Sequence, residues 1–120
     1  MLIIEHTLND RSQSFNCSGS LDLESFENFD QYFFGNYDKS IENIIINLKN
    51  VNYISSVGLR SLLRCAKQVY ADKNKIFLKV ENEMVKNIIT LSGFCKILPF
   101  LEDELWSLKL IRIKKMSFIF

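Results

Sequence analysis

Two adjacent serines, Ser55 and Ser56, have the residue type and position that a regulatory site needs. They precede leucines at helical spacing, so we expect them where a helix begins. The first N–H groups of a helix lack partners and, with the helix dipole, favour a nearby anion. Phosphorylation of Ser56 would add a charge of about −1.5 to −2 in that field. We predict a phosphorylation switch, although a plain capping role is the commoner outcome for serines before helices.

Other residues give little support for catalysis or metal binding. His6 is the only histidine, and we expect it at the surface without a role. No nucleophile has a visible base, and Asp103 and Glu104 suggest a solvated helix start. The cysteines are odd in number, widely spaced and without a C-x-x-C pair, which favours reduced thiols: Cys17, Cys65 and Cys95. We expect no enzyme activity, metal or cofactor.

Length and composition favour one globular domain over residues 1–120. The hydrophobic fraction is 48% and the charged fraction 24%, as in ordinary globular proteins. A net charge of +1 provides no large field for nucleic acid, so we expect Arg60, Arg64 and Lys67 to form a solvated or partner-facing side. The sequence lacks a signal peptide pattern and any apolar run of about 20 residues. We expect a cytoplasmic protein without stable membrane insertion.

The first third of the chain predicts a hairpin and a helix. Residues 1–8 and 15–18 have strand character and flank a polar turn at 9–14. Asp22 can cap a following helix that ends near residues 35–36. The expected apolar face of this helix contains Leu23, Phe26, Phe33 and Phe34.

The central third predicts a strand, a helix and a second strand. The β-branched run at residues 44–46 is typical of a central strand buried on both faces. A helix is expected at about residues 57–72 and a strand at 76–80, which together give a parallel crossover. This order defines the fold class as α/β.

The last third predicts a capped helix, an edge strand and a tail. Asn82 should cap a helix that ends at Gly93. Its expected buried stripe contains Met84, Val85, Ile88 and Ile89. Residues 97–100 suggest an edge strand and residues 103–110 a last helix. We expect the extra tail at 110–120 to pack on its own domain or on a copy of it, with a membrane-surface role as the lesser alternative.

Three blocks, at residues 18–22, 44–63 and 89–94, resemble the STAS domain of bacterial anti-sigma-factor antagonists. The resemblance spans roughly residues 18–109, and its blocks occur in the family's order. It implies a four- to five-stranded mixed sheet with helices mainly on one face. It also places the family's phosphorylated serine at Ser56.

The resemblance implies a regulator that binds an anti-sigma factor serine kinase and releases it when phosphorylated. A serine phosphatase would reset the switch, and the domain itself would catalyse nothing. The expected partner-binding surface contains Asp22, Ser55, Ser56, Val57, Gly58 and Arg60. The sequence does not decide whether the protein also forms a homodimer. The alternative from another class is a non-phosphorylated STAS subunit that docks on a membrane transporter ATPase.

Asn47 and Ser55 stand at positions where family members can have an aspartate, and Gly58 has two interpretations. Asn47 stands where the family commonly has an aspartate, which we expect to remove a charge near the switch loop. Ser55 stands where some members have an aspartate. Gly58 either allows close approach of a partner or neighbouring backbone, or simply relaxes the first helical turn.

Overall fold

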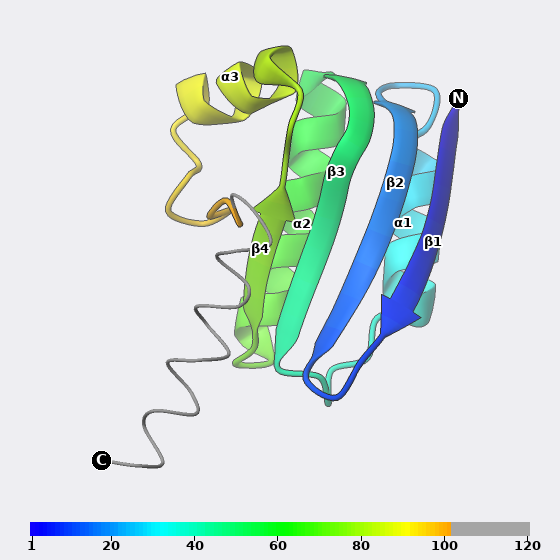
Figure 1. Ribbon diagram of the computed structural model, residues 1–120, viewed down its shortest axis with the longest axis vertical. Helices are drawn as coiled ribbons and strands as arrows, with labels where there is room; N and C mark the ends of the chain where they lie inside the picture. Colours follow the sequence, from blue (N-terminus) through cyan, green and yellow to red (C-terminus); the bar gives the residue numbers. More distant parts are fainter. Residues whose placement is uncertain (102–120) are drawn as a thin grey trace.

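A four-stranded mixed sheet with helices packed on it forms the part of the chain that the computed structural model describes, residues 1–101 (Figure 1). The strand order is β1-β2-β3-β4, which follows the sequence. The strands are β1 Leu2–Leu8, β2 Ser12–Leu21, β3 Asn43–Ile54 and β4 Lys75–Lys79. The helices are α1 Phe26–Asn36, α2 Ser56–Ala71 and α3 Glu83–Leu91. This confirms the predicted α/β class and STAS-like sheet.

Strands β1 and β2 form the predicted antiparallel hairpin. The turn is shorter than expected, because the Asn9 side chain organises it in three residues. Asn9 Oδ1 accepts hydrogen bonds from the amides of Arg11 and Ser12, at 3.1 and 2.9 Å. Strand β2 therefore begins at Ser12 instead of residue 15 and extends to Leu21.

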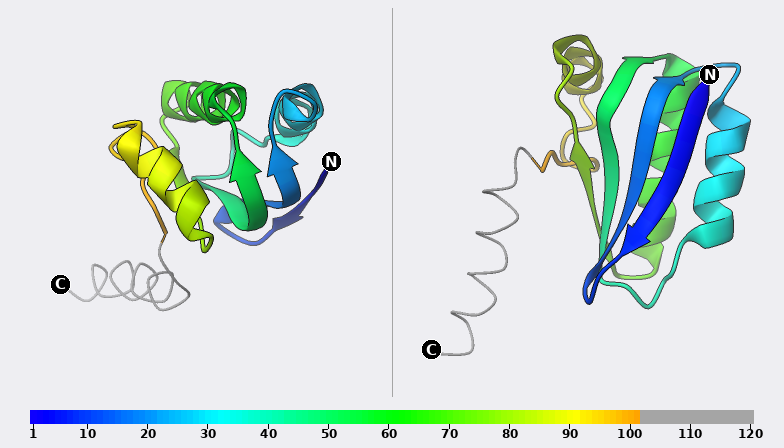
Figure 2. Two further views of the ribbon diagram at one scale, coloured as in Figure 1. Left: turned by 90° about the horizontal axis from the view of Figure 1, so that it is seen from above. Right: turned by 45° about the vertical axis from the view of Figure 1, so that its right-hand side comes forward.

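Strands β2, β3 and β4 are parallel, and α1 and α2 make the two crossovers between them. Both helices lie on the same face of the sheet (Figure 2). The prediction that β3 is central is confirmed. The prediction that it is buried on both faces is wrong: Ile44 and Ile46 are buried under the helices, whereas Ile45 on the other face is only half-buried.

Helix α1 begins at Phe26, later than Asp22 suggested, and this changes which residues are buried. Phe29 and Phe33, one turn apart, are fully buried. Leu23 lies in the turn before the helix and is 71% exposed, and Phe34 is 43% exposed, so both were wrongly assigned to the core.

Aromatic side chains of α1 pack against the β1–β2 hairpin. The ring centroids of Phe15 and Phe33 are 4.7 Å apart. His6 is not the plain surface residue that we expected: it is half-buried beside Phe15, and its Nδ1 lies 3.0 Å from the Tyr32 hydroxyl. Because a strand alternates its side chains, His6 faces α1 like Leu2 and Ile4.

The predicted signals of helix α3 are confirmed in part. Asn82 Oδ1 accepts a hydrogen bond from Val85 N at 3.1 Å, and Gly93 has the positive φ of 82° that suits a helix end. Val85 and Ile89 are buried, but Met84 is 54% exposed. Phe100 forms a parallel bridge to Leu78 at the sheet edge. The expected helix at 103–110 and the tail at 110–120 lie outside the described residues.

Candidate functional site

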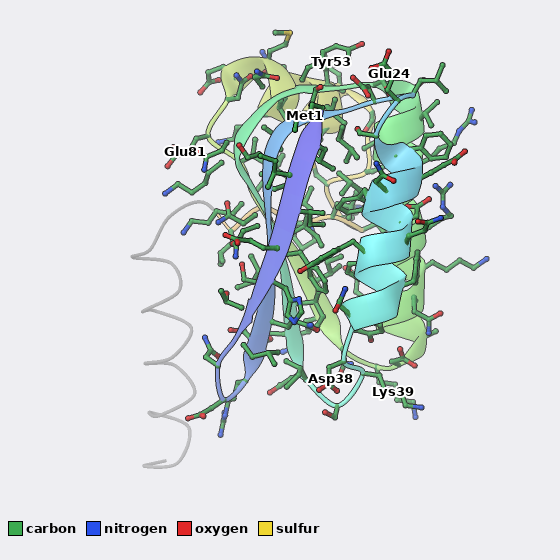
Figure 3. All side chains as sticks on the ribbon, turned by 90° about the vertical axis from the view of Figure 1, so that its right-hand side faces the viewer. Met1, Glu24, Asp38, Lys39, Tyr53 and Glu81 are labelled. Atoms are coloured by element: carbon green, nitrogen blue, oxygen red, sulfur yellow. The ribbon has the colours of Figure 1, made fainter. Side chains whose placement is uncertain are left out.

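The candidate site lies at the end of the sheet where β2 and β3 finish side by side. Leu21 is opposite Ile54, and the Ser55 amide donates a hydrogen bond of 3.0 Å to the Leu21 carbonyl. Figure 3 shows Glu24 and Tyr53, from the two chain segments, at this same end of the molecule. Because parallel strands bring their carboxyl ends to one edge, Asp22 and Ser55 follow directly at neighbouring positions.

The two serines differ: Ser55 caps helix α2, and Ser56 is exposed. Ser55 is the N-cap of α2, and its Oγ accepts a hydrogen bond from Gly58 N at 3.2 Å. Ser56 is the first residue of α2 and is exposed. Within residues 1–101, no side-chain hydrogen bond involves Ser56. The capping alternative therefore applies to Ser55 and leaves the Ser56 hydroxyl exposed.

Gly58 positions the start of α2 against the end of β2. It is buried, and a Cβ added there would lie 2.3 Å from the Leu21 carbonyl oxygen and 2.9 Å from Leu21 Cγ. Any side chain would therefore push the first turn of α2 away from the strand. Of the two interpretations of Gly58, the geometry supports close approach of neighbouring backbone.

Asp22 organises the turn between β2 and α1. Its Oδ1 accepts hydrogen bonds from the amides of Glu24 at 3.0 Å and Ser25 at 3.2 Å. The buried Ser25 hydroxyl closes the turn by donating to the Ser20 carbonyl at 2.7 Å. Ser25 was not among the predicted site residues, although the spacing Asp22-x-x-Ser25 is a recognisable turn signal.

The hydrogen bonds of this turn change the acidity of Asp22. Partial desolvation opposes the charged form, but hydrogen bonds from Ser20, Glu24 and Ser25 outweigh it, so the pKa of the Asp22 carboxyl is lowered. A carboxyl whose pKa falls on folding stabilises the fold above its unfolded pKa of about 3.9, and that stability is lost as the pH falls through the folded pKa.

We expect Asp22→Asn to be less stable than the wild type at neutral pH, since a neutral amide oxygen is a weaker acceptor for the two amides. The difference should shrink as the pH falls below about 4, where the wild-type carboxyl also becomes protonated. Urea unfolding of both proteins across that pH range measures it. A difference that is independent of pH would contradict the assigned role of the charge.

Val57 and Arg60 complete the predicted surface on the first turns of α2. Val57 is half-buried and Arg60 is exposed, one helical turn from Ser56. No acidic residue lies in the first turn of α2. The site therefore presents an exposed hydroxyl and a cation at a helix start.

The expected basic side of α2 is solvated, and at Arg64 it also contacts α1. This guanidinium forms an ion pair with Asp30 on α1 and also donates to Ser61 Oγ at 2.9 Å. Arg60 and Lys67 are exposed. Arg64 therefore links the two helices while its side chain stays 44% exposed.

The expectation that Asn47 lies near the switch loop is wrong. Asn47 is on the face of the sheet opposite the helices, and its amide donates to Asn16 Oδ1 at 3.0 Å. Ser55 is eight positions further along the chain from this strand residue, a distance of about 25 Å at the usual rise per residue. The missing charge therefore affects the open face of the sheet and not the switch.

The described part of the chain also bears on membrane crossing, metal binding and thiol reactivity. Within residues 1–101, no helix is both long and apolar enough to cross a membrane. In the same part of the chain, no three His, Cys, Asp or Glu side chains gather as metal ligands. Burial raises the pKa of the Cys17 thiol to about 12 and that of Cys65 well above its ordinary value, so neither thiol is activated.

Comparison with known proteins identifies the family. The sequence model of the STAS domain matches residues 4–105, most of the chain. The chain belongs to the STAS domain family. In this STAS domain, 62 residues are 34% identical to BtrV of Bordetella bronchiseptica, a protein named for anti-sigma factor antagonism. That match covers 52% of this chain and 53% of BtrV, so it spans about half of the relative's length.

Solved structures share the fold of this STAS domain at low sequence identity. An anti-sigma factor antagonist from Mycobacterium paratuberculosis superposes with a TM-score of 0.81 at 19% identity, covering 93% of this chain and 95% of that one. The Bacillus cell fate determinant SpoIIAA in its phosphorylated form gives a TM-score of 0.67 at 14% identity, covering 91% and 99%. These likenesses support the fold assignment.

Proposed function

We propose that this STAS domain is an anti-sigma-factor antagonist that binds an anti-sigma factor serine kinase and is released when Ser56 is phosphorylated. The single observation that carries the proposal is the exposed, unbonded hydroxyl of Ser56 at the first position of α2, while Ser55 does the capping. The name of BtrV and the phosphorylated form of SpoIIAA support the same class of function. The domain acts by binding, in the cytoplasm, and catalyses nothing.

The physical basis of the switch is charge placed on a docking surface. A phosphate on Ser56 would be the first acidic group in the opening turn of α2, where the unpaired N–H groups favour it. Arg60, one turn further, would face the same phosphate. The fold can therefore accept the modification, whereas a partner packed over Ser56 would have to desolvate it.

Phosphate transfer tests the proposal directly. The purified chain, incubated with a candidate kinase and ATP, should gain the mass of one phosphate, and fragmentation should place it on Ser56. Ser56→Ala should gain none, whereas Ser55→Ala should still be modified although its cap is lost. A serine phosphatase should remove the phosphate and restore binding.

Two results would count against the phosphorylation switch. Modification of Ser55 instead of Ser56 would contradict the division of roles between the serines. Stable capture of an ATPase partner by a chain that no kinase modifies would favour the transporter-subunit alternative.

A further inference from the structure

The two edges of the sheet differ in how well they are protected from pairing with another strand. The β4 edge is covered at Leu78 by the chain itself: Leu78 N donates to the Pro99 carbonyl at 2.8 Å, and Leu101 N donates to the Leu78 carbonyl at 2.6 Å. Lysines also stand at both ends of β4, at positions 75 and 79. Covering segments and lysines are the usual devices that prevent edge pairing.

Among residues 1–101, no covering segment and no lysine protects the β1 edge. Strand β1, with the sequence LIIEHTL, contains no lysine, proline or glycine, and one acidic residue, Glu5. It pairs with β2 in an unbroken register over all seven residues, without a bulge that would twist it away. Ile3 and Leu8 are 59% and 57% exposed. A regular and largely apolar edge of this kind is a template for another strand.

The hydrogen bonds at both ends of the hairpin identify the peptide groups on the free edge. Ser20 N donates to the Met1 carbonyl, and Asn9 N donates to the Ser12 carbonyl. In an antiparallel pair, alternate residues point their N–H and C=O groups to the same neighbour. The odd-numbered residues of β1 therefore bond to β2, and the free edge carries the peptide groups of the even-numbered residues Leu2, Ile4, His6 and Leu8.

We propose that β1 pairs antiparallel with β1 of a second copy of this chain, which gives a two-fold symmetric dimer with one continuous sheet. A second copy is the occupant that fits, because the chain covers the β4 edge at Leu78 and lysines stand at both ends of β4, which opposes head-to-tail pairing of β1 with β4. Pairing of β1 with itself is the arrangement that closes after two copies.

The charge of Glu5 selects the register. A two-fold axis at Glu5 would place two carboxylates directly opposite each other, which is destabilising. An axis at Ile4 avoids this clash and sets two β-branched isoleucines opposite each other, whereas an axis at His6 would set two imidazoles opposite each other. The axis at Ile4 sets Ile4 opposite Ile4, Leu2 opposite His6, and Ile3 opposite Glu5 of the second copy. The free peptide groups of β1 then bond to one another in pairs.

This dimer leaves the Ser56 surfaces available. The axis is perpendicular to the sheet, so the two carboxyl edges point to opposite ends of the assembly. Each copy could bind a partner without crowding the other. The dimer does not depend on phosphorylation, and it can be tested whether or not Ser56 is a switch.

A charge pair at position 3 tests both the dimer and its register. Ile3 is exposed and lies opposite uncharged Ser18 in its own hairpin, so lysine and glutamate there should be tolerated alike. In the dimer, Ile3→Lys would face Glu5 of the second copy twice, and Ile3→Glu would repel it twice. The dissociation constants of the two variants should differ by about tenfold or more.

Sedimentation equilibrium of the full chain over a concentration series measures this difference, with circular dichroism to confirm that each variant is folded. We expect a wild-type dimer, a dimer of Ile3→Lys that is as tight or tighter, and a monomer of Ile3→Glu over the same range. A wild-type protein that is monomeric throughout would overturn the proposal. Equal association of the two variants would also overturn it, because the interface would then lie elsewhere.

Discussion

Ser56→Asp is expected to abolish partner binding while leaving the domain folded. The side chain is exposed at the first turn of α2, so the carboxylate meets no obstacle within the domain. At a helix N-terminus it should stabilise the fold by about 0.5 kcal/mol. Within an interface the same charge would be desolvated without a partner, which should weaken binding about a hundredfold, or about 3 kcal/mol. Calorimetric titration with the cognate kinase measures the loss.

Ser56→Asn is the matched control for this charge substitution. Asparagine has the size and shape of aspartate but no charge, so it should bind within a few-fold of the wild type if charge is the switch. Equal loss of binding by both variants would show that bulk matters instead. Undiminished binding of Ser56→Asp would remove Ser56 from the interface and with it the proposed function.

Gly58→Ala is expected to destabilise the domain by about 2–3 kcal/mol, which is large for a single methyl group. The added Cβ would lie 2.3 Å from the Leu21 carbonyl oxygen and 3.0 Å from its carbonyl carbon. Both are backbone atoms and cannot rotate away. The Leu21 carbonyl also accepts the Ser55 amide, so relieving the clash would move the cap of α2. Urea denaturation gives the change in the free energy of unfolding.

Gly35→Ala provides the opposite expectation in the same protein. Gly35 is exposed in α1, and an added Cβ would have no heavy atom within 4 Å. Alanine has the higher helix propensity, so this variant should be stabilised by up to about 1 kcal/mol. If both variants lose stability equally, the contact between Gly58 and Leu21 is not the cause.

One packing contact connects the fold to the proposed switch. The backbone of Leu21 lies against Gly58 and bonds to Ser55, so the end of β2 determines where α2 begins. Ser56 is consequently held at a helix start whose position the end of β2 fixes. A partner would meet the hydroxyl in a defined position, which reduces the entropic cost of binding.

Local patterns in the sequence were sufficient for the order of the elements. The spacing of Leu59, Leu62 and Ala66 predicted α2 to within one residue at each end, and all three are buried. Asn82 and Gly93 marked the ends of α3, because capping and glycine stops depend on residues a few positions apart. The position of Ser56 at a helix start followed from the same local signals.

The tertiary structure decided which faces are buried and how the site is divided. Residues 44–46 looked buried on both sides, yet α1 and α2 cover one face, and no local pattern records which side a crossover helix packs on. That Ser55 caps α2 while Ser56 is exposed depends on where the Leu21 carbonyl meets the Ser55 amide. Such contacts join residues more than thirty positions apart. The sequence by itself therefore determined the elements and the candidate hydroxyl, and strand pairing determined its exposure.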